Sequence, residues 1–150
     1  MNRAFIGALF FILLFAYGCG TTIKELKEGD NKTVFIANEK YESVYRKILD
    51  KSRECFHDGF FGENILVQGD IYQEIKYANV NVVVTGKPVR SVMAIEIYSI
   101  NDNTSKVETY YDNPSDVPIV EAIEKWIKED YKECVAYPKG EPIDEQTKGR

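Results

Sequence analysis

The sequence predicts an α+β fold, a two-layer sandwich in which a mainly antiparallel sheet of four to five strands carries two helices on one face. Two segments, 39–56 and 115–134, place apolar residues three and four positions apart, the spacing of one helix face. Between them, apolar and polar residues alternate, as in strands with one buried face. The expected order of elements is β-α-β-β-β-β-α.

The first strand is expected at residues 33–37, a short β-branched and aromatic run. Asn38 then provides a cap for the first helix. The inward face of that helix is predicted to carry Tyr41, Val44, Tyr45, Ile48, Leu49, Cys55 and Phe56, with Ser52 in the remaining slot. The two glycines of "HDGFFGEN" end the helix.

Four strands are expected to follow as a meander, because the period changes to two from Asn64 onward. A turn at residues 86–88 and a loop at residues 101–105 separate the later strands. The residues predicted to face the helices are Ile65, Val67, Ile71 and Ile75, then Val80, Val82 and Val84, then Met93, Ile95 and Ile97, and finally Val107, Thr109 and Tyr111.

The last helix is expected to be capped by Ser115 or Asp116, and Pro118 suits its first turn. Its predicted inward face comprises Ile119, Val120, Ile123, Trp126, Ile127 and Tyr131.

Two cysteines fall on these inward faces. Cys55 follows Ile48 by seven positions, and Cys134 follows Ile127 by seven, so each is expected in the last turn of its helix. In an oxidising compartment such a pair is expected to form a disulfide that ties the two helix ends. Two buried thiols are the alternative.

The first eighteen residues have the order of a secretory signal peptide. Arg3 precedes an apolar run at residues 4–17, which is shorter than the roughly 17 to 20 residues that span a bilayer. Small residues follow at positions 18–20.

The stretch "FAYGC" at residues 15–19 resembles the lipobox of bacterial lipoproteins. The resemblance implies that Cys19 becomes the first residue of the mature chain and carries acyl chains such as palmitate, which hold it on a membrane. Acylation of Cys19 also leaves an even pair of cysteines in an exported protein. Cleavage by an ordinary signal peptidase at Ala16-x-Gly18 is the alternative.

These features divide the chain into a signal peptide (1–18), the acylated cysteine with a flexible tether (19–32), one domain (33–134) and a disordered tail (135–150). By similarity to lipoproteins of enteric-type bacteria, Gly20 favours the outer membrane over the inner membrane. The expected location is therefore the cell envelope, on the outer membrane facing the periplasm.

Charge and composition exclude several classes of function. The full chain carries a net charge of −5 and has no Lys/Arg cluster, which excludes a nucleic-acid-binding protein. The single histidine, His57, lies beside Asp58 in a turn without an identified nucleophile, so no enzyme is expected. One histidine with paired cysteines does not make a usual zinc site, and neither a metal nor a cofactor is expected.

The strand pattern places Tyr72, Tyr98 and Tyr110 among acidic residues on the sheet face opposite the helices. Tyrosine supplies a large contact area with a polar tip, so this face, or an edge strand, is expected to bind another envelope protein. The alternative is that tyrosine simply suits solvated strands.

The order of elements loosely resembles the helix-and-sheet domains of accessory lipoproteins in outer-membrane assembly machinery, which implies a non-enzymatic assembly role. A carrier of a small apolar ligand is the second hypothesis, with Tyr41, Tyr45, Trp126 and Tyr131 lining a pocket between sheet and helices. A hydrolase that depends on His57 is the third.

Overall fold

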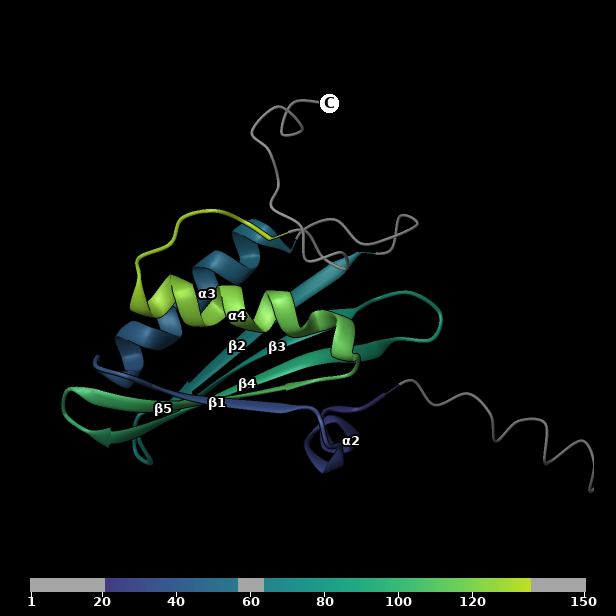
Figure 1. The fold of residues 1–150 in the computed structure, drawn as a ribbon. Helices are drawn as coiled ribbons and strands as arrows, with labels where there is room; N and C mark the ends of the chain where they lie inside the picture. Colours follow the sequence, from purple (N-terminus) through teal and green to yellow (C-terminus); the bar gives the residue numbers. More distant parts are fainter. Residues whose placement is uncertain (1–20, 57–63, 136–150) are drawn as a thin grey trace, which may run out of the picture.

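The structure, a computed structural model, describes residues 21–56 and 64–135. It confirms the α+β sandwich: a five-stranded antiparallel sheet carries two long helices on one face (Figure 1). In chain order the elements are α2 (Ile23–Glu28), β1 (Lys32–Ala37), α3 (Tyr41–Cys55), β2 (Ile65–Tyr72), β3 (Tyr77–Val84), β4 (Arg90–Asn101), β5 (Thr104–Tyr111), the 3-10 turn η2 (Pro114–Asp116) and α4 (Val117–Lys128).

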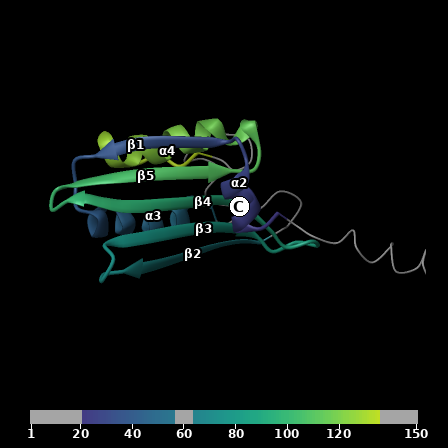
Figure 2. The ribbon, with the colours of Figure 1, turned by 90° about the horizontal axis from the view of Figure 1, so that it is seen from below.

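The sheet has the strand order β1-β5-β4-β3-β2, so β4 is central and β1 and β2 form the edges (Figure 2). Strands β2 to β5 form the predicted meander, and β1 pairs with β5 on its far side. We call the end with the β2–β3 and β4–β5 turns the distal end of the sheet, and the end with the β3–β4 turn the proximal end.

The core lies between the sheet and the helices α3 and α4, as the period of the apolar residues predicted. Most of the predicted inward residues are buried there, and several are fully buried: Val44, Ile48, Val80, Ile95, Ile97, Val107, Ile119 and Ile123. Gly69 of β2 shows how closely the layers approach, because a Cβ atom there would lie 2.8 Å from Leu49 Cδ1 and 2.9 Å from the Tyr45 hydroxyl oxygen.

Two residues predicted to face inward lie outside the strand or helix expected to contain them. Strand β2 ends at Tyr72, so Ile75 falls in the turn to β3 and is 71% exposed. Helix α4 ends at Lys128, so Tyr131 follows the helix, and it packs against the core, partly buried, from the irregular segment. In both cases the apolar period continues in the sequence beyond the residue where the backbone leaves the regular element.

The predicted helix caps are confirmed only in part. Lys40 occupies the capping position of α3, without a side-chain bond, in place of Asn38. Asp116, one of the two predicted caps, occupies the capping position of α4, but its buried side chain makes no capping bond. Before it, Asn113 caps η2 by accepting a hydrogen bond from the Ser115 backbone N–H at 3.0 Å.

The predicted pairing of Cys55 with Cys134 is confirmed, with Cα atoms 5.1 Å apart, a distance usual for a disulfide. Cys55 lies in the last turn of α3, as expected, but Cys134 lies in the irregular segment after α4. Trp126 Nε1 donates a hydrogen bond to the Glu133 carbonyl at 3.1 Å, which holds that segment against the helix. Val135, expected in a disordered tail, is buried in the core.

The expected flexible tether is contradicted by helix α2. Thr22 Oγ1 accepts from the Glu25 backbone N–H, and Glu25 Oε2 accepts from the Thr22 N–H at 2.7 Å, a complete capping box. Leu26 is only 3% exposed and packs against Ala94 and Tyr110, on the sheet face opposite α3 and α4 (Figure 2). Residues 21–32 are therefore part of the folded domain.

Several predictions fall outside the described residues, namely the signal peptide at 1–18, the acylation site Cys19, the histidine His57 and the tail from residue 136. Of the helices that the structure describes, none has the length and apolar character needed to cross a bilayer.

Candidate binding surface

Three tyrosines form a row across the sheet face opposite α3 and α4, which we call the outer face. Tyr72 of β2 is opposite Tyr77 of β3, and Tyr77 is opposite Tyr98 of β4. Their ring centroids lie 5.7 Å and 5.2 Å apart, within the range of favourable aromatic pairs. The next residue in the row, Lys106, places its ammonium 4.8 Å from the centre of the Tyr98 ring. We call Tyr72, Tyr77 and Tyr98 the tyrosine row.

Glu96 orients two of these rings. It lies beside the row on β4 and accepts hydrogen bonds from the Tyr77 hydroxyl at 2.8 Å and the Tyr98 hydroxyl at 2.7 Å. The ammonium of Lys27, from α2, binds the same carboxylate. Each carboxylate oxygen therefore has a partner, and the hydroxyl groups of both rings are held by Glu96.

Burial and hydrogen bonding set the protonation of this cluster. Burial raises the pKa of Tyr98 and of Tyr77, and the hydrogen bonds to Glu96 raise each pKa further. Burial alone would raise the pKa of Glu96, but the bonds from Lys27 and the two tyrosines outweigh it and lower that pKa. At neutral pH the tyrosines therefore donate to an ionised carboxylate.

Tyr110, the third predicted surface tyrosine, does not belong to the open surface. Helix α2 covers it, it is 8% exposed, and its hydroxyl donates to Glu108 at 2.7 Å. Two ammonium groups, of Lys32 and Lys106, also contact Glu108, at 3.1 Å and 3.2 Å. Tyr110 lies on the predicted face, but the expectation of an open surface there was wrong because helix α2 packs on it.

Of the other two predicted tyrosines, Tyr72 is 47% exposed and Tyr98 is partly buried. Sequence analysis missed Tyr77, although a signal was present. With Val80, Val82 and Val84 facing inward, the alternation of the same strand places Tyr77 outward.

Exposed aliphatic side chains surround the tyrosine row at the distal end. Ile36 of β1 continues the row beyond Lys106, while Ile75 and Ile100 lie at the β2–β3 and β4–β5 turns. Each of the three is at least 45% exposed. These three side chains and Tyr72 are exposed apolar groups at the distal end of the sheet.

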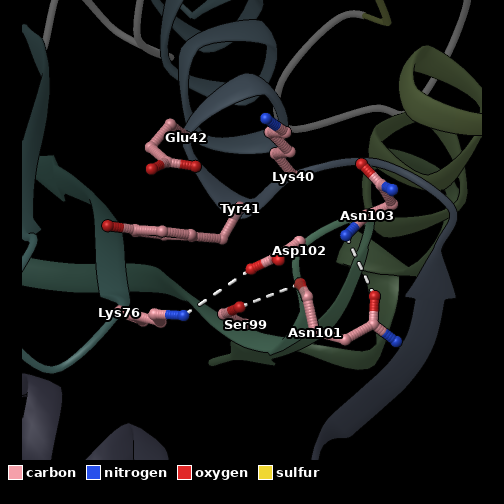
Figure 3. A pocket seen from close by; sticks show the side chains of 8 residues that line it. All are labelled: Lys40, Tyr41, Glu42, Lys76, Ser99, Asn101, Asp102 and Asn103. Carbon is pink, nitrogen blue, oxygen red and sulfur yellow. Dashed lines mark hydrogen bonds and ion pairs between the residues drawn. The ribbon is translucent and has the colours of Figure 1, made fainter.

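A polar hollow of about 280 Å³ lies at the same end, where the start of α3 meets the two distal turns (Figure 3). Its lining residues are Lys40, Tyr41, Glu42, Lys76, Ser99, Asn101, Asp102 and Asn103. Lys76 and Asp102 pair across it at 3.7 Å, and the Ser99 hydroxyl donates to the Asn101 carbonyl at 3.1 Å. The hollow offers charges and hydrogen bonds, and its one serine is not bonded to a base.

The remaining predictions concern metals and apolar ligands. Within residues 21–56 and 64–135, no three side chains of the metal-ligating types gather into a site. Tyr41, Tyr45 and Trp126 are buried in the packed core between sheet and helices, and the close approach at Gly69 leaves no room for an added methyl group there.

The chain matches no protein-family model, and no curated protein resembles it at a significant level.

Proposed function

We propose that this protein is an exported, lipid-anchored binding domain of the cell envelope, and that it presents the distal tyrosine row to another envelope protein. The anchor is Cys19, on the strength of the lipobox-like stretch at residues 15–19. The disulfide between Cys55 and Cys134 supports export, because disulfides persist in oxidising compartments such as the periplasm.

One observation supports the binding role: two of the three rings of the tyrosine row are oriented before any partner binds. Glu96 fixes Tyr77 and Tyr98 through their hydroxyl groups, so binding costs little side-chain entropy. Interfaces between proteins favour such rigid aromatic side chains surrounded by apolar and polar contacts.

The surroundings of the row fit a protein partner. Ile75 and Ile100 extend the apolar area at the turns, and the charged groups Lys106 and Asp102 lie beside it. An apolar centre with a charged rim is the usual anatomy of a protein interface. No described contact favours the carrier hypothesis, since the core is filled by its own side chains.

Site-specific photocrosslinking in the native cell tests the proposal. A photoreactive amino acid replaces Tyr72 or Ile75, and a matched control replaces Leu66, which lies on the same strand and face, is 44% exposed, and is at the proximal end. We expect one protein to be crosslinked from Tyr72 and from Ile75 but not from Leu66.

Substitutions then separate binding from folding. The double variant Tyr72→Ser/Ile75→Ser is expected to lose that crosslinked partner, while Leu66→Ser retains it and both variants unfold at the wild-type temperature. An identical set of crosslinked proteins from all three positions, or full capture by the double variant, would contradict the proposed site.

A further inference from the structure

We propose that the proximal end of the domain lies directly against an anionic phospholipid surface, through the β3–β4 turn, so that the distal tyrosine row points away from the membrane. This inference rests on the proposed lipid anchor at Cys19 and adds the orientation that the fold then imposes.

The chain between the anchor and the fold is short. The Ser91 N–H donates a hydrogen bond to the Thr21 carbonyl at 2.8 Å. The backbone at Thr21 is therefore attached to the start of strand β4. Cys19 is two residues earlier, and two consecutive Cα–Cα steps reach at most about 8 Å. An acylated Cys19 therefore brings the start of β4 to the membrane surface.

The segment after Thr21 is attached to the sheet and does not act as a flexible linker. The capping box of Thr22 and Glu25 begins α2, Leu26 is buried against the outer face, and Lys27 binds Glu96. The buried Leu26 and the Lys27–Glu96 ion pair thus join α2 to the sheet, so the chain is held to the sheet from Thr21 onward.

The β3–β4 turn, beside the anchor, exposes basic and apolar side chains. Val89 is two residues from Ser91, so its Cα atom lies within about 8 Å of the Ser91 Cα atom. Ser91 is the residue that bonds Thr21. Val89 is 60% exposed, and the exposed side chains of Lys87 and Arg90 lie on either side of it in the sequence. Arg90 also interacts electrostatically with Asp116, so Lys87 is the principal cation of this turn. Basic side chains beside an apolar one suit the interface of a membrane that contains anionic lipids.

Charge selects the side of the proximal end that faces the membrane. The β1 side of this end carries the exposed carboxylates of Asp30 and Asp112. Anionic headgroups repel these groups and attract Lys87 and Arg90. The β3–β4 turn therefore faces the lipid, and the β1 side faces solvent.

The length of the sheet determines what is presented. Strand β4 has 12 residues, which at about 3.3 Å per residue span roughly 35 to 40 Å. Ile75, in a distal turn, is then held about that distance above the headgroups, and the tyrosine row, which crosses β4 at Tyr98, eight residues after Arg90, is held roughly 26 Å above them.

Tryptophan quenching by brominated lipid tests this orientation. The chain has a single tryptophan, Trp126, which is buried and gives a common background. Val89→Trp and, as the matched distal control, Ile75→Trp are reconstituted in vesicles of phosphatidylglycerol and brominated phosphatidylcholine. We expect at least twofold stronger quenching for Val89→Trp than for wild type, and wild-type quenching for Ile75→Trp. Equal quenching at both positions, or wild-type quenching at Val89→Trp, overturns the proposal.

A charge test addresses the lipid class. In the Val89→Trp background, Lys87→Glu/Arg90→Glu is expected to reduce quenching at least twofold, while Lys76→Glu at the distal end leaves it unchanged. Quenching that does not respond to Lys87→Glu/Arg90→Glu, or that is equal in vesicles without phosphatidylglycerol, overturns the assignment to anionic headgroups.

The anchor is tested separately, so that the two failures can be told apart. The intact mass of the protein recovered from native membranes shows whether Cys19 is acylated. The orientation is measured on the mature chain beginning at Cys19, acylated in the cell or coupled through the Cys19 thiol to a maleimide phospholipid. A chain that is not acylated in the cell contradicts the proposed function, whereas the coupled chain still decides the orientation.

Discussion

At the scale of single residues, Asp116 is a polar group buried at a cost to stability. It is 2% exposed, and its Oδ2 atom has no hydrogen-bond partner within the described residues. Burial raises the pKa of this carboxyl to about 6. The protonated form is therefore favoured in the folded state, and ionisation opposes folding.

The pH dependence follows from the sign of this shift. Because the folded pKa lies above the unfolded value, the contribution of Asp116 to stability falls as pH rises from about 4 to about 6. Asp116→Asn does not titrate, so it is expected to gain on the order of 2 kcal/mol relative to wild type between pH 4 and pH 7.5. Urea unfolding at both pH values measures this, with the exposed Asp30→Asn as control. A difference that is constant with pH would contradict the assignment.

The sequence predicted only part of the candidate binding surface. Tyr72 and Tyr98 were placed correctly by alternation alone, because alternation specifies the face of a strand. Tyr110 was placed on the correct face as well, but alternation does not specify what packs on that face. Its burial depends on Leu26, which lies more than eighty positions away in the sequence.

At the scale of elements, α2 is the part of the fold that sequence reasoning missed. A helix of six residues is too short to show an amphipathic period, and an isolated helix of this length is unstable in water. Its signals were a capping box at Thr22 and Glu25 and one buried apolar residue, Leu26. By contrast, α3 and α4 were predicted because their apolar stripes extend over several turns.

Helix α2 is expected to depend on Leu26. Leu26→Ala removes most of its apolar contact with Ala94 and Tyr110, and large-to-small substitutions at buried sites cost about 2 to 5 kcal/mol. We therefore expect faster hydrogen exchange in the peptide covering residues 21–31 and at Ser91, whose N–H bonds Thr21, with the exchange of β2 and β3 unchanged. The exposed Lys24→Ala is the control, and exchange that increases equally throughout the sheet would show that α2 is not a separable unit.

At the scale of the whole molecule, the order of layers was predictable from the sequence. The spacing of apolar residues in each long helix or strand indicates which of its faces is buried. The ends of elements were less predictable, since apolar residues such as Ile75 and Tyr131 continue a period after the backbone has turned. The disulfide was found from sequence because both cysteines fall near the end of such a period, although only Cys55 lies within a helix.

The disulfide closes a long segment of the domain. The two cysteines are separated by 79 positions, and loop-closure entropy for that length corresponds to roughly 4 kcal/mol. The double variant Cys55→Ala/Cys134→Ala is expected to lose about that amount of unfolding free energy in urea titrations, with wild-type secondary structure before the transition. A loss below about 1 kcal/mol would contradict a structural role for the bond.

The carboxylate of Glu96 is shared by two parts of the molecule, α2 through Lys27 and the tyrosine row through Tyr77 and Tyr98. Energies of groups that share one partner are not additive. A double-mutant cycle between Lys27 and Tyr98 should therefore return a coupling energy different from zero, although one side chain is on a helix and the other on a strand. Helix α2 and the tyrosine row are thereby thermodynamically linked through one side chain.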